Sequence, residues 1–360
     1  MQSRFIYTSR EFVNISQSIN SVLEQIPLIS EGRRLLRITV YGSPTDNNAY
    51  MRDRDMVEAA LHHNYRGAMP VWSYVAQPPF ESIIAAEVWF SHNEQEWYIE
   101  NVAHAGVDYI RMRRGEVKRI LVGGLSALHR DQRISIYDQS KAICGVMDQI
   151  LRFEQIPIRN IVRQWNYIER ITFEDENNQH YQEFNDARSE LYSKCEWTYG
   201  YPAATGIGAL SGGVVIDFDA TVGEEIIPID NELQVAAHAY SKGVLIGEKS
   251  QKTTPKFERA KLSGDLMYIS GTAAIRGEES LVGVSAAEQT RITLENIDEL
   301  LRNGTCSEAR SLKVYIKYRE DFEQIRDVVE CYAPYDALYL FADICRDELL
   351  MEIEALAYRD

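Results

Sequence analysis

The sequence feature that most restricts the fold of this 360-residue chain is a helix–strand segment that recurs 150 residues later. Residues 138–152 have a helical pattern and are followed by a strand-like run, and residues 288–302 have the same layout. Four identities fall in register without a gap, since Gln139, Asp148, Leu151 and Arg152 match Gln289, Asp298, Leu301 and Arg302. Strand-like and helical segments before and after this core match in the same order, which favours duplication over chance similarity between two amphipathic helices.

Each half of the repeat is predicted to fold as strand, strand, helix, strand, helix, strand. This order predicts an α+β protein with two units in one chain, in which helices cover one face of each mixed sheet. We expect an N-terminal extension at 1–36, a first unit at 37–222, a connector at 223–254 and a second unit at 255–360.

Charge and cysteine content exclude several classes of function. The formal net charge is −16, which argues against generic binding to nucleic acid or to acidic membranes. An anionic substrate would therefore need a local group of arginines or lysines. Five cysteines without CxxC spacing indicate a reducing compartment and argue against a disulfide framework or a structural zinc site. Because the sequence shows neither an apolar leader nor a long apolar run, we expect a cytoplasmic protein without a membrane span.

Common cofactor and hydrolase motifs are absent from the sequence. It contains no P-loop, no GxGxxG after a strand, no HExxH and no GxSxG. The seven histidines are scattered and do not form a pattern typical of metal ligands. We therefore expect neither a cofactor nor a metal.

The last strand-like run, residues 349–357, carries the most informative side chains. It is apolar except for Glu352 and Glu354, which strand alternation places on one face. Two carboxyl groups on a buried strand are costly unless they are paired, protonated or catalytic. Asp217 and Asp219 hold the equivalent places in the first unit, so paired acids are partly a property of the repeat. That favours a structural role for Glu354 and leaves Glu352 as the candidate for chemistry.

Two further segments are candidates for binding an anion. The small-residue run Thr205-Gly206-Ile207-Gly208 is expected to form a turn whose backbone N–H groups face a ligand, although an ordinary tight turn fits the pattern equally well. Arg259 precedes an apolar strand and, on its own, fits a surface residue better than a binding residue.

Motifs along nearly the whole chain carry a family resemblance. The second half resembles a subunit of the YjgF/reactive-intermediate-deaminase superfamily, whose subunits form trimers with ligand clefts at their interfaces. The whole chain is similar to a longer, duplicated branch of that superfamily, the chorismatases, which include 3-hydroxybenzoate synthases. The matching runs are Tyr41-Gly-x-Pro44, Pro70-x-x-Ser73-Tyr-Val-Ala-Gln77, Pro202-Ala-x-Thr205-Gly-Ile-Gly208, Phe257-x-Arg259-Ala260, Ala342-Asp-Ile-Cys-Arg346 and Glu352-Ile-Glu354.

The resemblance implies removal of pyruvate from chorismate, giving a hydroxybenzoate or a dihydroxycyclohexadiene acid for secondary metabolism. It implies that Glu352 protonates the enolpyruvyl ether, and that Arg346 and Arg259 bind the two substrate carboxylates. Tyr201 and the backbone of Thr205 and Gly206 would complete the pocket. The resemblance associates Cys345 with the branch that forms 3-hydroxybenzoate.

One departure from the family pattern leaves the substrate open. Glu258 stands where the family has alanine or glycine against the substrate ring, and a carboxylate there would repel a dianion unless it turns away or pairs with Arg259 or Lys256. The alternatives are an enzyme for a related cyclohexadiene or enolpyruvyl acid, or a non-catalytic ligand-binding protein of the superfamily. The resemblance leaves two oligomeric states, a monomer that mimics a trimer or a homotrimer.

Overall fold

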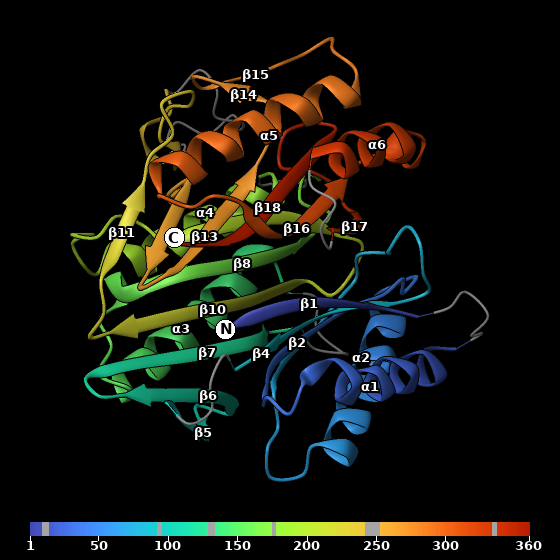
Figure 1. Cartoon of the computed structure of the whole chain (residues 1–360), viewed down its shortest axis with the longest axis vertical. Helices are drawn as coiled ribbons and strands as arrows, with labels where there is room; N and C mark the ends of the chain where they lie inside the picture. The colour runs from blue at the N-terminus through green and yellow to red at the C-terminus, as the bar shows by residue number, and fades with distance from the viewer. Residues whose placement is uncertain (9–13, 92–95, 129–133, 175–177, 242–252, 333–336) are drawn as a thin grey trace.

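The described part of the protein contains three large sheets with outward helices and one two-stranded sheet (Figure 1). The computed structural model describes residues 1–8, 14–91, 96–128, 134–174, 178–241, 253–332 and 337–360. The prediction of an α+β fold with two repeated units is confirmed, and the N-terminal part adds a third sheet.

The N-terminal sheet contains four strands in the order β1-β4-β2-β3. Its elements are β1 (Gln2–Tyr7), α1 (Ile15–Ser30), β2 (Leu35–Tyr41), α2 (Asn47–Asn64), β3 (Val71–Val75) and β4 (Ala85–Phe90). The expected first unit, 37–222, therefore spans two sheets, and the expected extension, 1–36, supplies the first strand and first helix of the N-terminal sheet.

The middle sheet contains six strands in the order β5-β6-β7-β10-β8-β9. Its elements are β5 (Tyr98–His104), β6 (Val107–Arg114), β7 (Val117–Ser126), α3 (Ile136–Phe153), the 3₁₀ turn Ile158–Asn160, β8 (Ile161–Glu169), α4 (His180–Tyr192), β9 (Ala203–Ala209) and β10 (Val214–Val222).

The C-terminal sheet has the equivalent order, β11-β12-β13-β18-β16-β17. Its elements are β11 (Ile226–Ile229), β12 (Ala260–Ser263), β13 (Leu266–Thr272), the small hairpin β14 (Ile275–Arg276) and β15 (Glu279–Ser280), α5 (Ala286–Asn303), β16 (Ala309–Ile316), α6 (Phe322–Tyr332), β17 (Ala337–Phe341) and β18 (Met351–Tyr358). Short 3₁₀ turns at Ala237–Ala239 and Arg319–Asp321 precede β12 and α6.

The N-terminal sheet repeats the last four strands of the other two. In each sheet the final strand lies between the first shared strand and a parallel pair, which is β2 with β3, β8 with β9, or β16 with β17. A helix joins the strands of each parallel pair, as a parallel connection requires. The chain thus contains three units of one topology, of which the first lacks the two leading strands.

The residues that repeat in the sequence have repeated structural roles. Gln139 on α3 accepts a hydrogen bond from Val214 N at 3.1 Å, and Gln289 on α5 accepts one from Leu350 N at 2.9 Å. Each glutamine therefore ties its helix to the start of the last strand in its unit. Ser135 and Ser285 cap the two helices by accepting from the backbone N–H three residues later.

The inner faces of the three sheets meet at the centre of the molecule. Trp89, Trp165 and Tyr268, one from each sheet, lie with ring centroids 5.9–6.4 Å apart. All three are at most 3% exposed. This aromatic centre lies where the three units meet.

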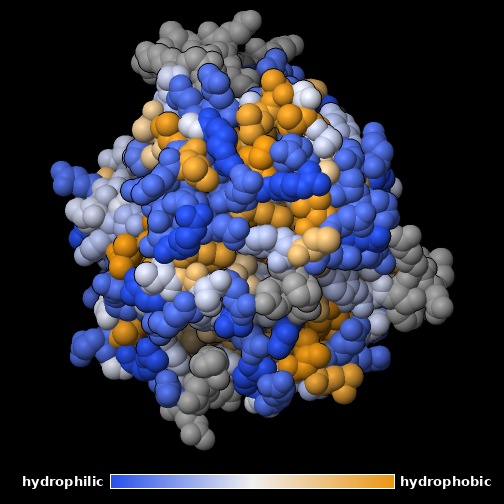
Figure 2. Space-filling model, turned by 45° about the horizontal axis from the view of Figure 1, so that its top comes forward, coloured by the Kyte–Doolittle hydropathy of each residue, from blue (hydrophilic) through white to orange (hydrophobic). Residues whose placement is uncertain are grey.

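The outer surface shown in Figure 2 is mostly hydrophilic, with hydrophobic side chains in separate groups. Within the described residues, no helix has the length and apolar character needed to cross a membrane.

Candidate active site

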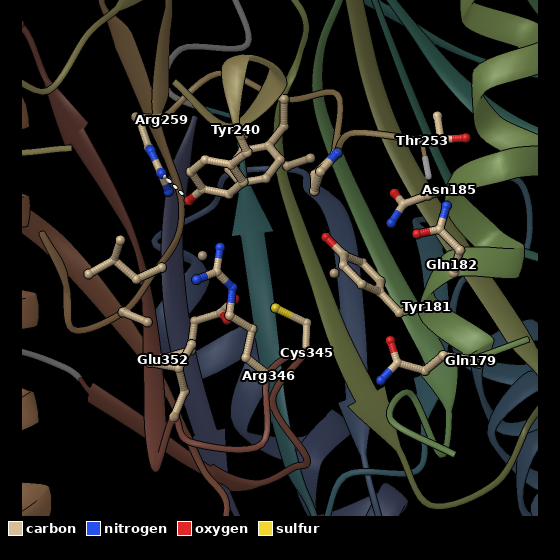
Figure 3. Close-up of a pocket in the computed structure, with 18 residues that line it drawn as sticks. Gln179, Tyr181, Gln182, Asn185, Tyr240, Thr253, Arg259, Cys345, Arg346 and Glu352 are labelled. Carbon is tan, nitrogen blue, oxygen red and sulfur yellow. Dashed lines mark hydrogen bonds between the residues drawn. The ribbon is translucent and has the colours of Figure 1, made fainter. Parts of the chain in front are cut away.

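A cavity lies between the middle unit and the C-terminal unit. Residues of α4 and β9 form one wall, and the C-terminal unit supplies the other (Figure 3). The space open to the centre of a water molecule is about 70 Å³. The lining side chains are Gln179, Tyr181, Gln182, Asn185, Ala204, Gly206, Tyr240, Thr253, Pro255, Phe257, Arg259, Gly271, Ala273, Ile275, Cys345, Arg346, Leu349 and Glu352.

Five of the predicted site residues line this cavity: Glu352, Cys345, Arg346, Arg259 and Gly206. They come from two units and from segments about 150 residues apart in the sequence. The fold therefore brings together the acid and the two arginines that the sequence singled out.

The other three predicted residues, Tyr201, Thr205 and Glu258, do not line the cavity. The expected turn at 205–208 is wrong, because these residues belong to β9 and pair in parallel with β8. The Gly208 N–H donates to the Asp343 carbonyl oxygen at 2.9 Å, and glycine at 206 leaves room for Tyr181, whose ring would lie 3.0 Å from a Cβ there. Thr205 is 1% exposed, and its hydroxyl points away from the cavity to Glu354.

Glu258 turns away from the cavity. Its Oε1 accepts a hydrogen bond from Tyr201 N at 2.8 Å, and its backbone pairs with Ala203 across the seam between units. Lys261 donates to the carbonyl oxygens of Gly200 and Tyr201 at 2.9 and 2.8 Å. Glu258 and Lys261 therefore hold the 200–201 turn of the middle unit against the C-terminal unit, and the expected repulsion of a dianion by Glu258 does not arise in this geometry.

Glu352 is buried with an unbonded carboxyl group. It is 5% exposed, and among the described residues no hydrogen bond to its side chain is found. Burial, reinforced by the nearby charge of Glu354, raises the pKa of Glu352 to about 8. Its Oε1 lies so close to Gly271 that a Cβ at that position would be 1.8 Å away. Glu352 thus presents a neutral acid to the cavity at neutral pH.

Glu354, on the same face of β18, has the opposite surroundings. Its carboxylate contacts Arg163 Nη2 at 2.7 Å, Lys313 Nζ at 2.7 Å and Thr205 Oγ1 at 2.6 Å. Burial alone would raise its pKa, but Lys313 and Arg163 lower the pKa of Glu354 to about 2. Both interpretations of the glutamate pair therefore apply, one to each residue.

Two arginines at the cavity have no carboxylate partner among the described residues. Arg346 Nη1 donates to the Glu278 carbonyl oxygen at 3.1 Å and to Ser280 Oγ at 3.0 Å. Arg259 Nη2 donates to the Val235 carbonyl oxygen at 2.8 Å and to Tyr240 OH. Two guanidinium groups whose charge is not balanced by a carboxylate of the described residues make a site for an acid with two anionic groups.

Tyr240 lies next to both guanidinium groups (Figure 3). Its ring centroid is 5.5 Å from Arg259 Cζ and 5.0 Å from Arg346 Cζ, a cation–π arrangement that fixes both arginines. Tyr240 was not among the predicted site residues, because it lies in a connector without periodicity. Tyr181, Gln182 and Asn185 were not predicted either, although their spacing on a helix places them on one face.

Cys345 lies beside Glu352 and Arg346 in Figure 3. Burial, with the proximity of Glu352, raises the pKa of the Cys345 thiol to about 12. The side chain is therefore a neutral thiol and not a thiolate nucleophile. No group of three or more His, Cys, Asp or Glu side chains that could hold a metal occurs in the described part of the chain.

Comparisons with known proteins identify both halves of the site. The family model described as "Chorismatase FkbO/Hyg5-like, N-terminal" matches residues 97–220, and the model described as "Endoribonuclease L-PSP" matches residues 247–359. These two matches correspond to the middle unit and the C-terminal unit, which form the two walls of the cavity.

Curated relatives match the chain at moderate identity. A 3-hydroxybenzoate synthase of Streptomyces hygroscopicus is 30% identical over 226 residues, which are 56% of this chain and 65% of the relative. A chorismatase of Streptomyces rapamycinicus is 29% identical over 218 residues, 55% of this chain and 64% of the relative. The matched stretch therefore spans slightly less than two thirds of each of these two relatives.

The fold matches a solved structure along its whole length. A crystal structure of a chorismatase superposes with a TM-score of 0.72 and 22% identity, covering 99% of this chain and 98% of that chain. The chain is thus similar to chorismatases in its middle and C-terminal units, and the solved structure shows that it shares their fold.

Proposed function

We propose that the protein is an enzyme that removes pyruvate from chorismate or a close analogue. The observation that carries the proposal is the pairing of a buried neutral acid, Glu352, with two cavity arginines, Arg259 and Arg346, that have no carboxylate partner in the described residues. The names of the relatives, 3-hydroxybenzoate synthase and chorismatase, support chorismate as the substrate.

The proposed reaction starts with proton transfer from Glu352 to the terminal methylene carbon of the enolpyruvyl ether. This step leaves an oxocarbenium ion and needs a carboxyl group that is still protonated near neutral pH. Water then adds to the cation, and the resulting hemiketal breaks its C–O bond to release pyruvate and the ring alcohol. In the alternative route the ring C–O bond breaks and pyruvate leaves with that oxygen, the neighbouring ring hydroxyl closes onto the freed ring carbon, and loss of a ring proton gives the hydroxybenzoate. Glu352 regains its proton from the attacking group, so the cycle needs no cofactor.

The two arginines would bind the ring carboxylate and the enolpyruvyl carboxylate, with Tyr240 holding both guanidinium groups in place. Tyr181 and the amides of Gln182 and Asn185 on the facing helix α4 would contact the ring hydroxyl. Cys345, a neutral thiol beside Glu352, favours 3-hydroxybenzoate as the product through the family resemblance.

Incubation with chorismate and a coupled pyruvate assay tests this proposal, with aromatic products separated by chromatography. We expect pyruvate release by the wild type and a loss of roughly 10²–10⁴-fold in kcat for Glu352→Gln. Glu288→Gln, on the exposed side of α5, is the matched control and should retain full activity. Absence of pyruvate with the wild type, or full activity of Glu352→Gln, would refute the proposal.

A thermal-shift panel separates the remaining alternatives. Stabilisation by chorismate with turnover supports the proposal, whereas stabilisation by another cyclohexadiene or enolpyruvyl acid identifies a different substrate. Binding without turnover of any of them identifies a ligand-binding protein.

We also propose that the protein is a monomer, because the three units already surround one axis within a single chain. Light scattering coupled to size exclusion should give a mass near 41.3 kDa. A mass three times larger would indicate a homotrimer instead.

A further inference from the structure

Three buried cations link the three sheets in a ring around the central axis. Arg37 on β2, Arg163 on β8 and Lys313 on β16 occupy equivalent places, and each is at most 3% exposed. Arg37 pairs with Asp219 of the middle sheet, Arg163 with Glu354 of the C-terminal sheet, and Lys313 with Glu87 of the N-terminal sheet. Each unit thus donates a cation to a carboxylate of another unit.

Glu354 is the carboxylate of this ring with the most partners. Arg163, Lys313 and Thr205 contact it as described above, and Trp165 Nε1 donates to its Oε1 at 2.9 Å. Arg163 Nη2 also donates to Thr205 Oγ1 at 2.6 Å. A buried carboxylate with this many donors stays ionised.

The ring reaches the active site through the position of Glu354 on β18. Glu354 lies two residues from Glu352 on the same face of the strand, a separation of roughly 6.6 Å along the backbone. At that distance in a buried site, a fixed negative charge strongly disfavours ionisation of the second carboxyl group.

Thr205 provides a second connection. Its Oγ1 accepts a hydrogen bond from Gly271 N at 3.1 Å while donating to Glu354. Gly271 is the residue against which the Glu352 carboxyl packs. The hydroxyl therefore fixes both the charge next to Glu352 and the backbone that contacts it.

We propose that Glu354, held as a carboxylate by Arg163, Lys313 and Thr205, is a positioning residue that keeps Glu352 in its protonated, proton-donating form. Arg163 and Lys313 contact the Glu354 carboxylate itself, so they offset only part of its negative charge at the position of Glu352. The inference rests on the proposed function only for its activity readout. Charged or titratable groups face Glu352 from several elements packed around it. They are Glu354 on β18, Arg163 on β8, Arg259 before β12, Cys345 and Arg346 in the β17–β18 loop, and Tyr181 on α4.

A titration of Glu352 without substrate tests the inference directly. Infrared difference spectra between wild type and Glu352→Gln isolate the carbonyl band of the protonated Glu352 side chain across pH. In Glu354→Gln, we expect the midpoint of that band to fall by at least one pH unit. The high-pH limb of kcat should fall by the same amount.

Asp219→Asn is the matched control, because Asp219 is the ring carboxylate at the equivalent strand position of the middle sheet. It pairs with Arg37 and accepts from Tyr268 OH at 3.1 Å, away from Glu352. This variant should lose stability and leave the Glu352 titration unchanged. An unshifted midpoint in folded Glu354→Gln, or an equal shift in Asp219→Asn, would overturn the inference.

Lys313→Met gives a second test that does not depend on the folding of Glu354→Gln. Lys313 is one of the two cations that hold Glu354 ionised, so its removal should move the Glu352 midpoint downward, and an upward shift would contradict the proposal. Because the spectra need no turnover, a shifted midpoint in a protein inactive on chorismate would retain this inference and reject the substrate.

Discussion

Asp217 on β10 and Glu352 on β18 occupy the same place in two sheets of one strand order, yet their surroundings are opposite. Asp217 pairs with Trp165 of β8, and Glu352 with Tyr315 of β16, at equivalent points of the register. Asp217 accepts hydrogen bonds from Ser73 Oγ at 2.6 Å and Gly124 N at 2.7 Å. Glu352 has no hydrogen bond among the described residues.

A two-residue displacement of a β-bulge explains the difference. In β7 the bulge falls between Val122 and Leu125, opposite Asp217, and Gly124 gives its N–H to that carboxylate. In β13 the bulge falls between Ile269 and Thr272, opposite Glu354, and Gly271 gives its N–H to Thr205 instead. The bulge therefore satisfies a structural acid in the middle sheet and leaves the equivalent acid of the C-terminal sheet without a donor.

Substitutions at the glycines of the two bulges should have the largest effect on the difference between the two acids. In Gly271→Ala the new Cβ would lie 1.8 Å from Glu352 Oε1, so the carboxyl group must leave its position. We expect a loss of at least about 10²-fold in pyruvate release, since a displaced acid no longer reaches the substrate. The assay is the coupled pyruvate measurement, with unfolding followed in parallel.

Gly123→Ala is the matched variant in β7. Its Cβ would lie 2.7 Å from a methyl group of Val71, so the change overpacks the seam between the N-terminal and middle units. We expect a stability loss of about 1–3 kcal/mol with unchanged kcat. Equal kinetic effects of the two alanines would show that the bulges do not distinguish the two acids.

The pH dependence of activity should show the special surroundings of Glu352 through a smaller effect. Glu352 acts as an acid only while protonated, and burial together with Glu354 raises its pKa to about 8. Activity should be level below about pH 8 and fall about tenfold per pH unit above it. A rate that rises through this range would mean that the ionised form of Glu352 is the active one.

The free energy of unfolding should also depend on the ionisation of Glu352. The folded pKa of Glu352 lies above its ordinary value, so the unfolded state releases the proton at lower pH than the folded state. The stabilisation is complete below about pH 4.5 and is lost as pH rises to about 8, a decline of roughly 3–5 kcal/mol. Denaturant unfolding should show that decline in wild type relative to Glu352→Gln, which cannot ionise.

The sequence was sufficient for the features that depend on local periodicity. The helices α3 and α5 were predicted because Gln139 and three further residues recur after 150 residues, and the shared face of Glu352 and Glu354 follows from strand alternation. The N-terminal unit escaped detection because it lacks two strands and has no residues in register with the repeat. Its first strand and first helix, at Gln2–Tyr7 and Ile15–Ser30, lie in the segment that was expected to be an N-terminal extension.

Orientations across the seams between units could not be predicted. Glu258 was expected to face the substrate, but it bonds to Tyr201 N of another unit, a contact that no local pattern encodes. Thr205 was placed in a turn because its neighbours are small, whereas their small size serves close packing of β9 against Tyr181.

The hydroxyls of Ser73 and Thr205 provide the smallest test of the comparison. They occupy equivalent places, since Ser73 pairs with Thr39 of β2 and Thr205 with Trp165 of β8. Ser73 donates to Asp217, the structural acid, so Ser73→Ala should cost about 1–3 kcal/mol in unfolding free energy and leave the pH profile of kcat in place.

Thr205→Val should have a similar thermal effect, because Thr205 donates to Glu354 at 2.6 Å, but it should also move the high-pH limb of kcat. Loss of that donor weakens the hold on the Glu354 charge and releases Gly271 from its bond to the hydroxyl. Thermal unfolding and pH profiles of both variants check this pair. If Ser73→Ala moves the high-pH limb of kcat and Thr205→Val does not, then contacts of the N-terminal unit and not those around Glu354 control the ionisation of Glu352.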